Sequence, residues 1–156
     1  MRIGIDARIA YYTRAGIGQY TWRLIQALAA LDHADEFHIF KHRKDQTEFT
    51  QQANFEHHAV YTPSHNRFEI YLLGLEMLWS GLALDILHST DFIPPQWKPA
   101  GCKSVITIHD LAFLHYPHFL TKTSARYYGQ IEDAVKRADH IIAVSGKDRV
   151  VGHVAI

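Results

Sequence analysis

Short apolar segments alternate along this chain with segments whose apolar residues recur every three or four positions. The segments of strand character are nearly continuously apolar, which is typical of strands covered on both faces. This alternation predicts a parallel sheet with right-handed helical crossovers, so we expect an α/β fold with a doubly wound, Rossmann-like parallel sheet. The expected strands are 2–7, 36–40, 57–61, 84–89, 103–110 and 140–145, and the expected helices are 17–31, 67–79 and 123–138.

The composition fits one globular domain with balanced charge. The chain has 156 residues, of which 47% are hydrophobic and 21% charged, and its formal net charge is zero. Balanced charge argues against a nucleic-acid-binding protein, which usually carries a basic excess. The single cysteine excludes an intrachain disulfide. We find neither a signal peptide nor an apolar run of about 18 residues, so we expect a cytoplasmic protein.

Polar side chains follow several of the expected strands. In an open parallel sheet, ligands bind beyond the carboxyl ends of the strands, so these residues predict a site along one edge. They are Asp6 and Arg8 after the first strand, His88, Ser89, Thr90 and Asp91 at the fourth, His109 and Asp110 at the fifth, and Ser145 at the last. Ordinary polar turns at strand ends are the alternative.

The pair His109–Asp110 directly follows a strand rich in β-branched residues. A histidine there can donate a hydrogen bond to a substrate hydroxyl or stabilise charge. Asp110 can cap the next segment or fix the tautomer of the histidine. A purely structural pair explains the same residues, so both interpretations stay open.

The segment "AGIGQY" places Gly16 and Gly18 just before a helix. Backbone N–H groups at such a helix start attract an anion, and glycine lets a ligand approach the backbone closely. The dinucleotide fingerprint needs a third glycine where Thr21 stands, and no phosphate-binding G-K-[ST] follows. The sequence therefore predicts an anion site of another kind, or a plain flexible loop.

Four motifs in this order resemble the N-terminal domain of glycosyltransferase family 4: "GIGQYTWRLIQAL", "HSTDFIPP", "VITIHDLAFLHYPHFLT" and "ADHIIAVS". Enzymes of that family have the GT-B architecture, in which two Rossmann-like domains face each other across a cleft. The resemblance implies a retaining transfer of a sugar, of the hexosyltransferase type, from a nucleotide-sugar donor to an acceptor hydroxyl.

The resemblance also implies roles for individual residues. Gly16, Ile17 and Gly18 would lie near the donor diphosphate, and His109, followed by Asp110, would contact the donor sugar near the reacting carbon. The residues implied on the acceptor side are Thr90, Asp91 and the stretch from Phe113 to Phe119.

We expect no metal or other cofactor. The fold does not usually need a metal, and the histidines show no spacing typical of a metal site. His115 and His118 are three residues apart, but no cysteine or carboxylate stands near them as a further ligand.

The resemblance covers only one half of a GT-B enzyme. We therefore expect residues 1–156 to form a single acceptor-side domain with little or no activity alone, because the nucleotide-binding C-terminal domain is absent from the sequence. The expected partners are a nucleotide sugar, a glycan, lipid-linked or small-molecule acceptor, and the missing domain or a partner chain, but no nucleic acid. The alternative is a Rossmann-like binding or assembly module that pairs with another chain, including a second copy of itself. An NAD-dependent oxidoreductase is disfavoured by the defective fingerprint.

The expected helix over 67–79 is apolar on most sides. We interpret it as a buried core helix. The alternative is a helix that dips into a membrane interface, with the protein peripheral at the inner membrane face, but Arg67 is the one basic residue in it.

Overall fold

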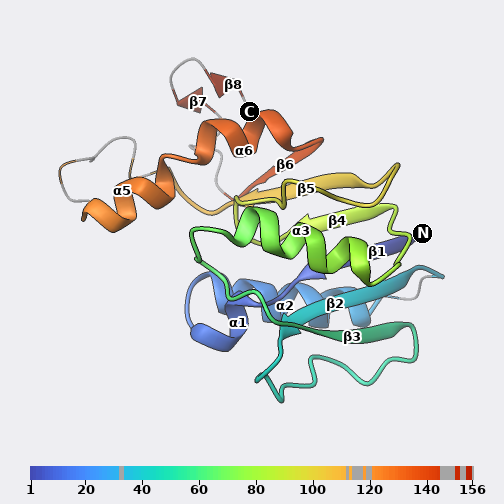
Figure 1. Cartoon of the computed structure of the whole chain (residues 1–156). Coiled ribbons are helices and arrows are strands. Elements are labelled where there is room, and N and C mark those ends of the chain that lie inside the picture. The colour runs from blue at the N-terminus through green and yellow to red at the C-terminus, as the bar shows by residue number, and fades with distance from the viewer. Residues whose placement is uncertain are drawn as a thin grey trace.

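A parallel sheet organises the molecule (Figure 1). The computed structural model describes residues 1–31, 34–111, 113, 118, 121–144, 150–151 and 154–155. Within them, six strands form a sheet in the order β3-β2-β1-β4-β5-β6, and all neighbouring pairs are parallel. The strands are β1 (Arg2–Asp6), β2 (Glu36–His42), β3 (Phe55–Val60), β4 (Ile86–Ser89), β5 (Lys103–Ile108) and β6 (His140–Ala143). This order is that of a doubly wound sheet, so the predicted fold class is confirmed.

Helices cover both faces of the sheet. Figure 1 shows α3 (Glu69–Trp79) in front of the strands and α2 (Ile17–Ala29) behind them. Because successive side chains of a strand point to opposite faces, the core is divided into separate apolar clusters. The cluster on the α2 face includes Ile5, Ile25, Phe37 and Ile39. The cluster under α3 includes Phe40, Leu73, Met77 and Leu87.

The segment before β6 differs from the prediction. The single helix predicted over 123–138 is two helices, α5 (Lys122–Tyr128) and α6 (Ile131–Arg137). The break falls at Gly129, which ends α5, because glycine is a poor helix former. The short helix α1 (Ile9–Tyr12) and the antiparallel pair β7 (Val150–Val151) and β8 (Val154–Ala155) were not expected from the sequence.

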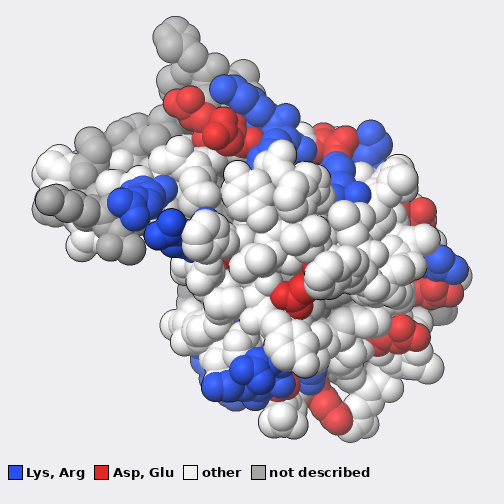
Figure 2. Space-filling model, viewed as in Figure 1, with Lys and Arg blue, Asp and Glu red and all other residues white. Residues whose placement is uncertain are grey.

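Helix α3 is not the buried core helix that its composition predicts. It buries Leu73 and Met77, but Tyr71, Leu72 and Leu78 are exposed and Trp79 is 83% exposed. Figure 2 shows a broad uncharged surface over this helix, with charged side chains mostly around it. The interpretation fails because a helix that covers one face of a sheet has an outer side, which no described segment covers here. None of the described helices is long and apolar enough to cross a membrane.

Candidate functional site

The ends of three strands are tied together at the carboxyl edge of the sheet, as the sequence predicts. The Thr90 hydroxyl, just after β4, donates to the backbone oxygen of Asp6 at the end of β1 over 2.8 Å. His109, just after β5, bonds to the Thr90 carbonyl oxygen, also over 2.8 Å. The chain reverses its winding direction between β1 and β4, and ligands of doubly wound sheets bind at this point.

The hydrogen bond from His109 defines the tautomer of its ring. A carbonyl oxygen can only accept, so the Nε2 atom of His109 carries the proton and donates it to Thr90. In the neutral ring, Nδ1 is then an acceptor. The ring is half-buried, and its edge-to-face contact with Tyr20 of α2 has a centroid distance of 4.7 Å. The tautomer is therefore fixed at Nε2 by Thr90, a role for which the sequence offered Asp110.

A buried polar chain lies beneath His109. The Tyr20 hydroxyl is 3.3 Å from the Thr107 hydroxyl, which in turn lies 2.8 Å from Nε2 of His88. Burial lowers the pKa of His88 to about 4, so this histidine is neutral at physiological pH. His88 is thus a buried strand residue that is linked through Thr107 to Tyr20, whose ring contacts His109.

Asp6 and Arg8 form a buried ion pair. The guanidinium of Arg8 contacts both carboxylate oxygens of Asp6, at 2.9 and 2.7 Å, and the side chain of Arg8 is 3% exposed. The same guanidinium lies 3.5 Å from Glu69 of α3, which is also buried. Burial raises the pKa of Glu69 to about 7, although Arg8 opposes this rise. Sequence reasoning missed Glu69, because nothing in its local pattern connects it with β1.

A second polar cluster surrounds Asp91. Its carboxylate accepts hydrogen bonds from the Tyr127 hydroxyl over 2.6 Å and from His65 over 3.1 Å. Burial alone would raise the pKa of Asp91, but the bonds from His65, Tyr127 and the backbone N–H of Phe92 lower it. The bond to Asp91 raises the pKa of His65.

His65 and Tyr127 were not found from the sequence, because they come from segments far from residue 91. His65 precedes α3 and Tyr127 belongs to α5. The backbone of His65 has a φ of +61°, a left-handed conformation that is uncommon outside glycine and is concentrated at functional sites. This backbone conformation is visible only in the folded structure.

Residues of both clusters line a cavity of about 10 Å³. Its lining includes Asp6, Arg8, Glu69, Ser89, Asp91 and Tyr127. The Ser89 hydroxyl is buried and has no hydrogen-bond partner among the described residues. Such a volume holds about one water molecule, so this cavity is too small for a sugar or a nucleotide.

The glycine-rich loop has structural reasons for both of its glycines. Gly16 is the N-cap of α2, with a φ of +53° and a ψ of −121°, a backbone conformation that residues other than glycine rarely adopt. A Cβ atom at Gly18 would lie 1.9 Å from the Thr13 carbonyl oxygen. Ile17 begins the helix that carries Tyr20 to His109. The loop is therefore one helical turn from Tyr20, whose ring contacts His109. The first amides of α2 lack an acceptor within the helix.

The remaining site residues of the sequence prediction differ from one another in burial. Asp110 is exposed, whereas Phe113 is buried and stacks on Tyr128 with 4.3 Å between ring centroids. Thr90 is 1% exposed and its hydroxyl lies 2.8 Å from that of Thr21. The other residues of the predicted acceptor stretch, including His115 but not His118, lie outside the described residues. Ser145 also lies outside them.

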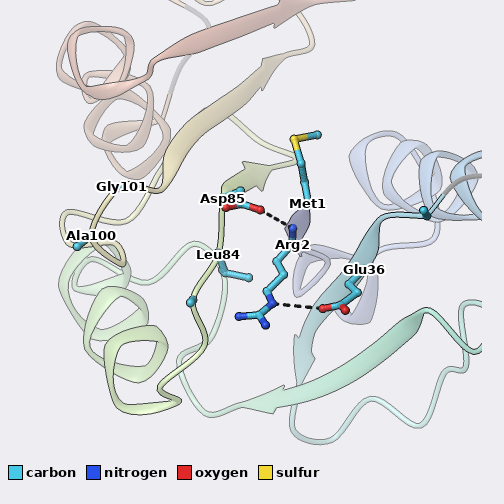
Figure 3. Close-up of a pocket in the computed structure, with 9 residues that line it drawn as sticks. Met1, Arg2, Glu36, Leu84, Asp85, Ala100 and Gly101 are labelled. Carbon is cyan, nitrogen blue, oxygen red and sulfur yellow. Dashed lines mark hydrogen bonds and ion pairs between the residues drawn. The ribbon is translucent and has the colours of Figure 1, made fainter.

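A larger depression, of about 410 Å³, lies at the opposite, amino-terminal edge of the sheet (Figure 3). Arg2 bonds to two other residues of the lining: the Nε atom of Arg2 is 3.3 Å from Glu36, and the backbone N–H of Arg2 donates to Asp85 over 2.7 Å. His109 and Thr90 do not line it. The described side chains that converge closely enough to hold a metal ion, His38, Glu56 and His58, lie on β2 and β3, on the side of β1 away from β5 and His109.

The comparison with known families agrees with this arrangement. The sequence profile of Glycosyltransferase Family 4 matches residues 14–149, which include the glycine-rich loop, the β4 exit and His109. No curated relative matches the chain. The match extends over most of the sequence, and the fold is that expected for the N-terminal domain of such enzymes. The chain therefore belongs to glycosyltransferase family 4.

Proposed function

We propose that this domain forms one wall of a glycosyl-transfer cleft that moves a sugar from a nucleotide-sugar donor to an acceptor hydroxyl with retention at the anomeric carbon. The observation that carries this proposal is the position of His109. Its ring is held at the carboxyl edge of the sheet by the Thr90 carbonyl and by Tyr20. In the neutral state its Nδ1 can accept a hydrogen bond from a sugar hydroxyl. In the protonated state the positively charged ring can stabilise negative charge on the substrate.

The donor diphosphate would lie at the start of α2. The amides that begin this helix at Ile17 carry partial positive charge, and donors aimed at a departing diphosphate stabilise the transition state. Gly16 leaves open space beside these amides, because no heavy atom lies within 4 Å of the position its Cβ would take, whereas Gly18 lets α2 pack against Thr13. Because Tyr20 lies one turn further on, the same helix joins the diphosphate position to His109.

The acceptor would lie toward Asp91. The hydroxyl of Thr90 is already bonded within the protein, so Thr90 acts through its carbonyl rather than as a direct acceptor contact. His65 is exposed on one side and bonded to Asp91 on the other, which suits a residue that orients an acceptor hydroxyl. Asp110, also exposed, borders the same edge. Phe113, buried against Tyr128, supports this side from within.

Neither the cavity nor the edge encloses a nucleotide. A second domain, in the same polypeptide or in another chain, would supply the opposite wall, the nucleotide pocket and the cationic groups for the diphosphate. We expect weak donor binding and little or no transfer without it, and we expect no metal or other cofactor to take part at this edge. A hexose donor is the class proposed.

The test is a titration of the ¹⁵N-labelled protein with UDP-, GDP- and ADP-hexoses, followed by backbone amide shifts. We expect shifts at residues 16–18 and 109 that weaken at least fivefold in His109→Ala. His140→Ala is the matched control, because His140 is exposed at the amino end of β6, remote from this edge. Shifts confined to other regions, or equal in both variants, would contradict the proposal.

A second candidate function, an assembly module, is favoured by the exposed side of α3. Its apolar side chains are Tyr71, Leu72, Leu78 and Trp79, with Trp97 beside Tyr71. Such a patch is typical of an interaction surface, and a second copy of this chain is the simplest occupant. Light scattering over a concentration series would show a dimer that Trp79→Glu disrupts; a monomer at all concentrations would remove this candidate.

A further inference from the structure

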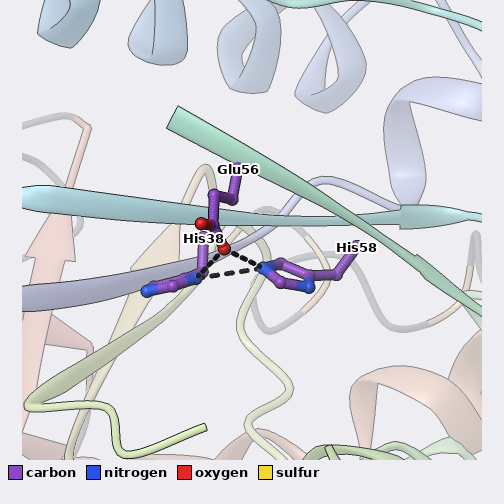
Figure 4. A group of neighbouring side chains, drawn as sticks. All are labelled: His38, Glu56 and His58. Atoms are coloured by element: carbon purple, nitrogen blue, oxygen red, sulfur yellow. Dashed lines mark hydrogen bonds and ion pairs between the residues drawn. The ribbon is translucent and has the colours of Figure 1, made fainter. Parts of the chain in front are cut away.

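The neighbouring strands β2 and β3 bring two histidines and a glutamate together on the side of β1 away from β5 and His109. His38 of β2 is the direct partner of Glu56 in the parallel register, and His58 follows two residues later on β3. Residues two apart on a strand share a face, so all three side chains project from the same face of the sheet. Figure 4 shows them converging on one point. β2 lies three strand positions from β5, which leads into His109, roughly 14 Å by strand spacing alone, and β3 lies one position further.

The spacing of their ligand atoms fits a metal ion. Nδ1 of His38 lies 3.0 Å from Nε2 of His58, and each of these nitrogens lies 3.6 Å from a carboxylate oxygen of Glu56. A tetrahedral zinc ion with bonds of about 2.0 Å holds its ligand atoms roughly 3.3 Å apart. One cation therefore reaches all three atoms with side-chain movements of a few tenths of an ångström.

Burial and ligand chemistry select the class of cation. His38 is 5% exposed, whereas Glu56 is exposed, so the cluster is closed on the side of β2 and open to solvent beside Glu56. Two imidazole nitrogens and one carboxylate oxygen suit zinc and the neighbouring transition metals, and they suit magnesium and calcium poorly. Solvent access leaves a fourth position for water.

We propose that His38, Glu56 and His58 bind a divalent transition cation of the zinc type, which joins the edge strand β3 to β2. The proposal does not depend on the glycosyl-transfer function. It also departs from the sequence expectation of no metal. The ligands come from two strands, and their spacing along the sequence is not typical of a metal site. Nε2 of His38 is buried without a hydrogen-bond partner among the described residues. A hydrogen bond from the second ring nitrogen of a metal-bound histidine typically strengthens metal binding by 10–100-fold. Because Nε2 of His38 lacks such a bond among the described residues, we expect micromolar rather than nanomolar affinity.

The test is calorimetric titration of the chelator-treated protein with ZnCl₂, together with the visible absorption of bound Co²⁺, which reports four-coordinate geometry. We expect one zinc ion at this site, a thermal midpoint that rises with zinc concentration, and no effect of Mg²⁺. Glu56→Gln should weaken binding at least tenfold, and it should fold normally because Glu56 is exposed. His58→Ala should weaken binding at least a hundredfold.

His57→Ala is the matched control, because His57 lies between the two ligands on β3 but projects from the opposite face. It should bind zinc like the unaltered protein. Absence of zinc binding, unchanged binding in both Glu56→Gln and His58→Ala, or equal loss in His57→Ala would overturn the proposal.

Discussion

The buried carboxylate of Glu69 makes stability depend on pH in a direction opposite to that of most acidic residues. One guanidinium, that of Arg8, faces two buried carboxylates and is bonded bidentately to Asp6. Burial, reinforced by Asp6 and opposed by Arg8, raises the pKa of Glu69 to about 7. The folded state therefore holds a proton on Glu69 more tightly than the unfolded state. The resulting stabilisation is complete below pH 4.5 and is lost as the pH rises through 7.

The size of the effect follows from the shift. A rise in pKa from 4.5 to about 7 corresponds to about 3–4 kcal/mol in total at 1.4 kcal/mol per unit. Glu69→Gln cannot ionise but keeps an oxygen that can accept from the backbone N–H of His65. Between pH 4.5 and pH 8 we expect the unfolding free energy of the unaltered protein to fall by about 3 kcal/mol relative to that of Glu69→Gln.

Urea unfolding at several pH values measures this difference. Titrating groups that do not interact with Glu69, such as the buried His88, affect both proteins alike and cancel in the comparison. Glu132→Gln, at an exposed position of α6, is the control and should leave the pH profile unchanged. A difference between Glu69→Gln and the unaltered protein that stays constant with pH, or that changes in the opposite direction, would refute the reasoning.

Three further substitutions test the packing of the site by urea unfolding. Gly18→Ala should cost about 3 kcal/mol, because its Cβ meets the Thr13 carbonyl, and an unchanged midpoint would contradict this contact. Phe113→Ala should cost about 3–4 kcal/mol as a buried ring; a loss below 1 kcal/mol would place the ring outside the core. Tyr127→Phe should cost about 2 kcal/mol by removing the hydrogen bond to Asp91, whose pKa should then rise by NMR titration.

The sheet could be predicted from the sequence because its signal is local. The segment "VITI" within β5 consists of β-branched residues alone, and the helical spacing from Ile17 onward separates the first two strands. Parallel strands with helical crossovers follow from this order by general topological rules. The gathering of Asp6, Thr90 and His109 at one edge follows from the same rules.

The contacts that shape the site could not be predicted, because they join segments distant in sequence. The pairing of Arg8 with Glu69 spans 61 residues, and that of His65 with Asp91 spans 26. Hydrophobic spacing also does not reveal which side of α3 remains uncovered. Its side chains are apolar on both sides, and only the position of the sheet decides that Leu73 is buried and Trp79 exposed.

The most direct measurement of the central claim is the imidazole ¹H–¹⁵N spectrum of His109, recorded with and without a nucleotide sugar. We predict the Nε2–H tautomer in the free protein, because Nε2 donates to the Thr90 carbonyl. We also predict that the donor moves the Nδ1 resonance of His109 while that of His140 stays unchanged. An Nδ1–H tautomer in the free protein, or a His109 ring that does not respond to a donor shown to bind, would contradict the account.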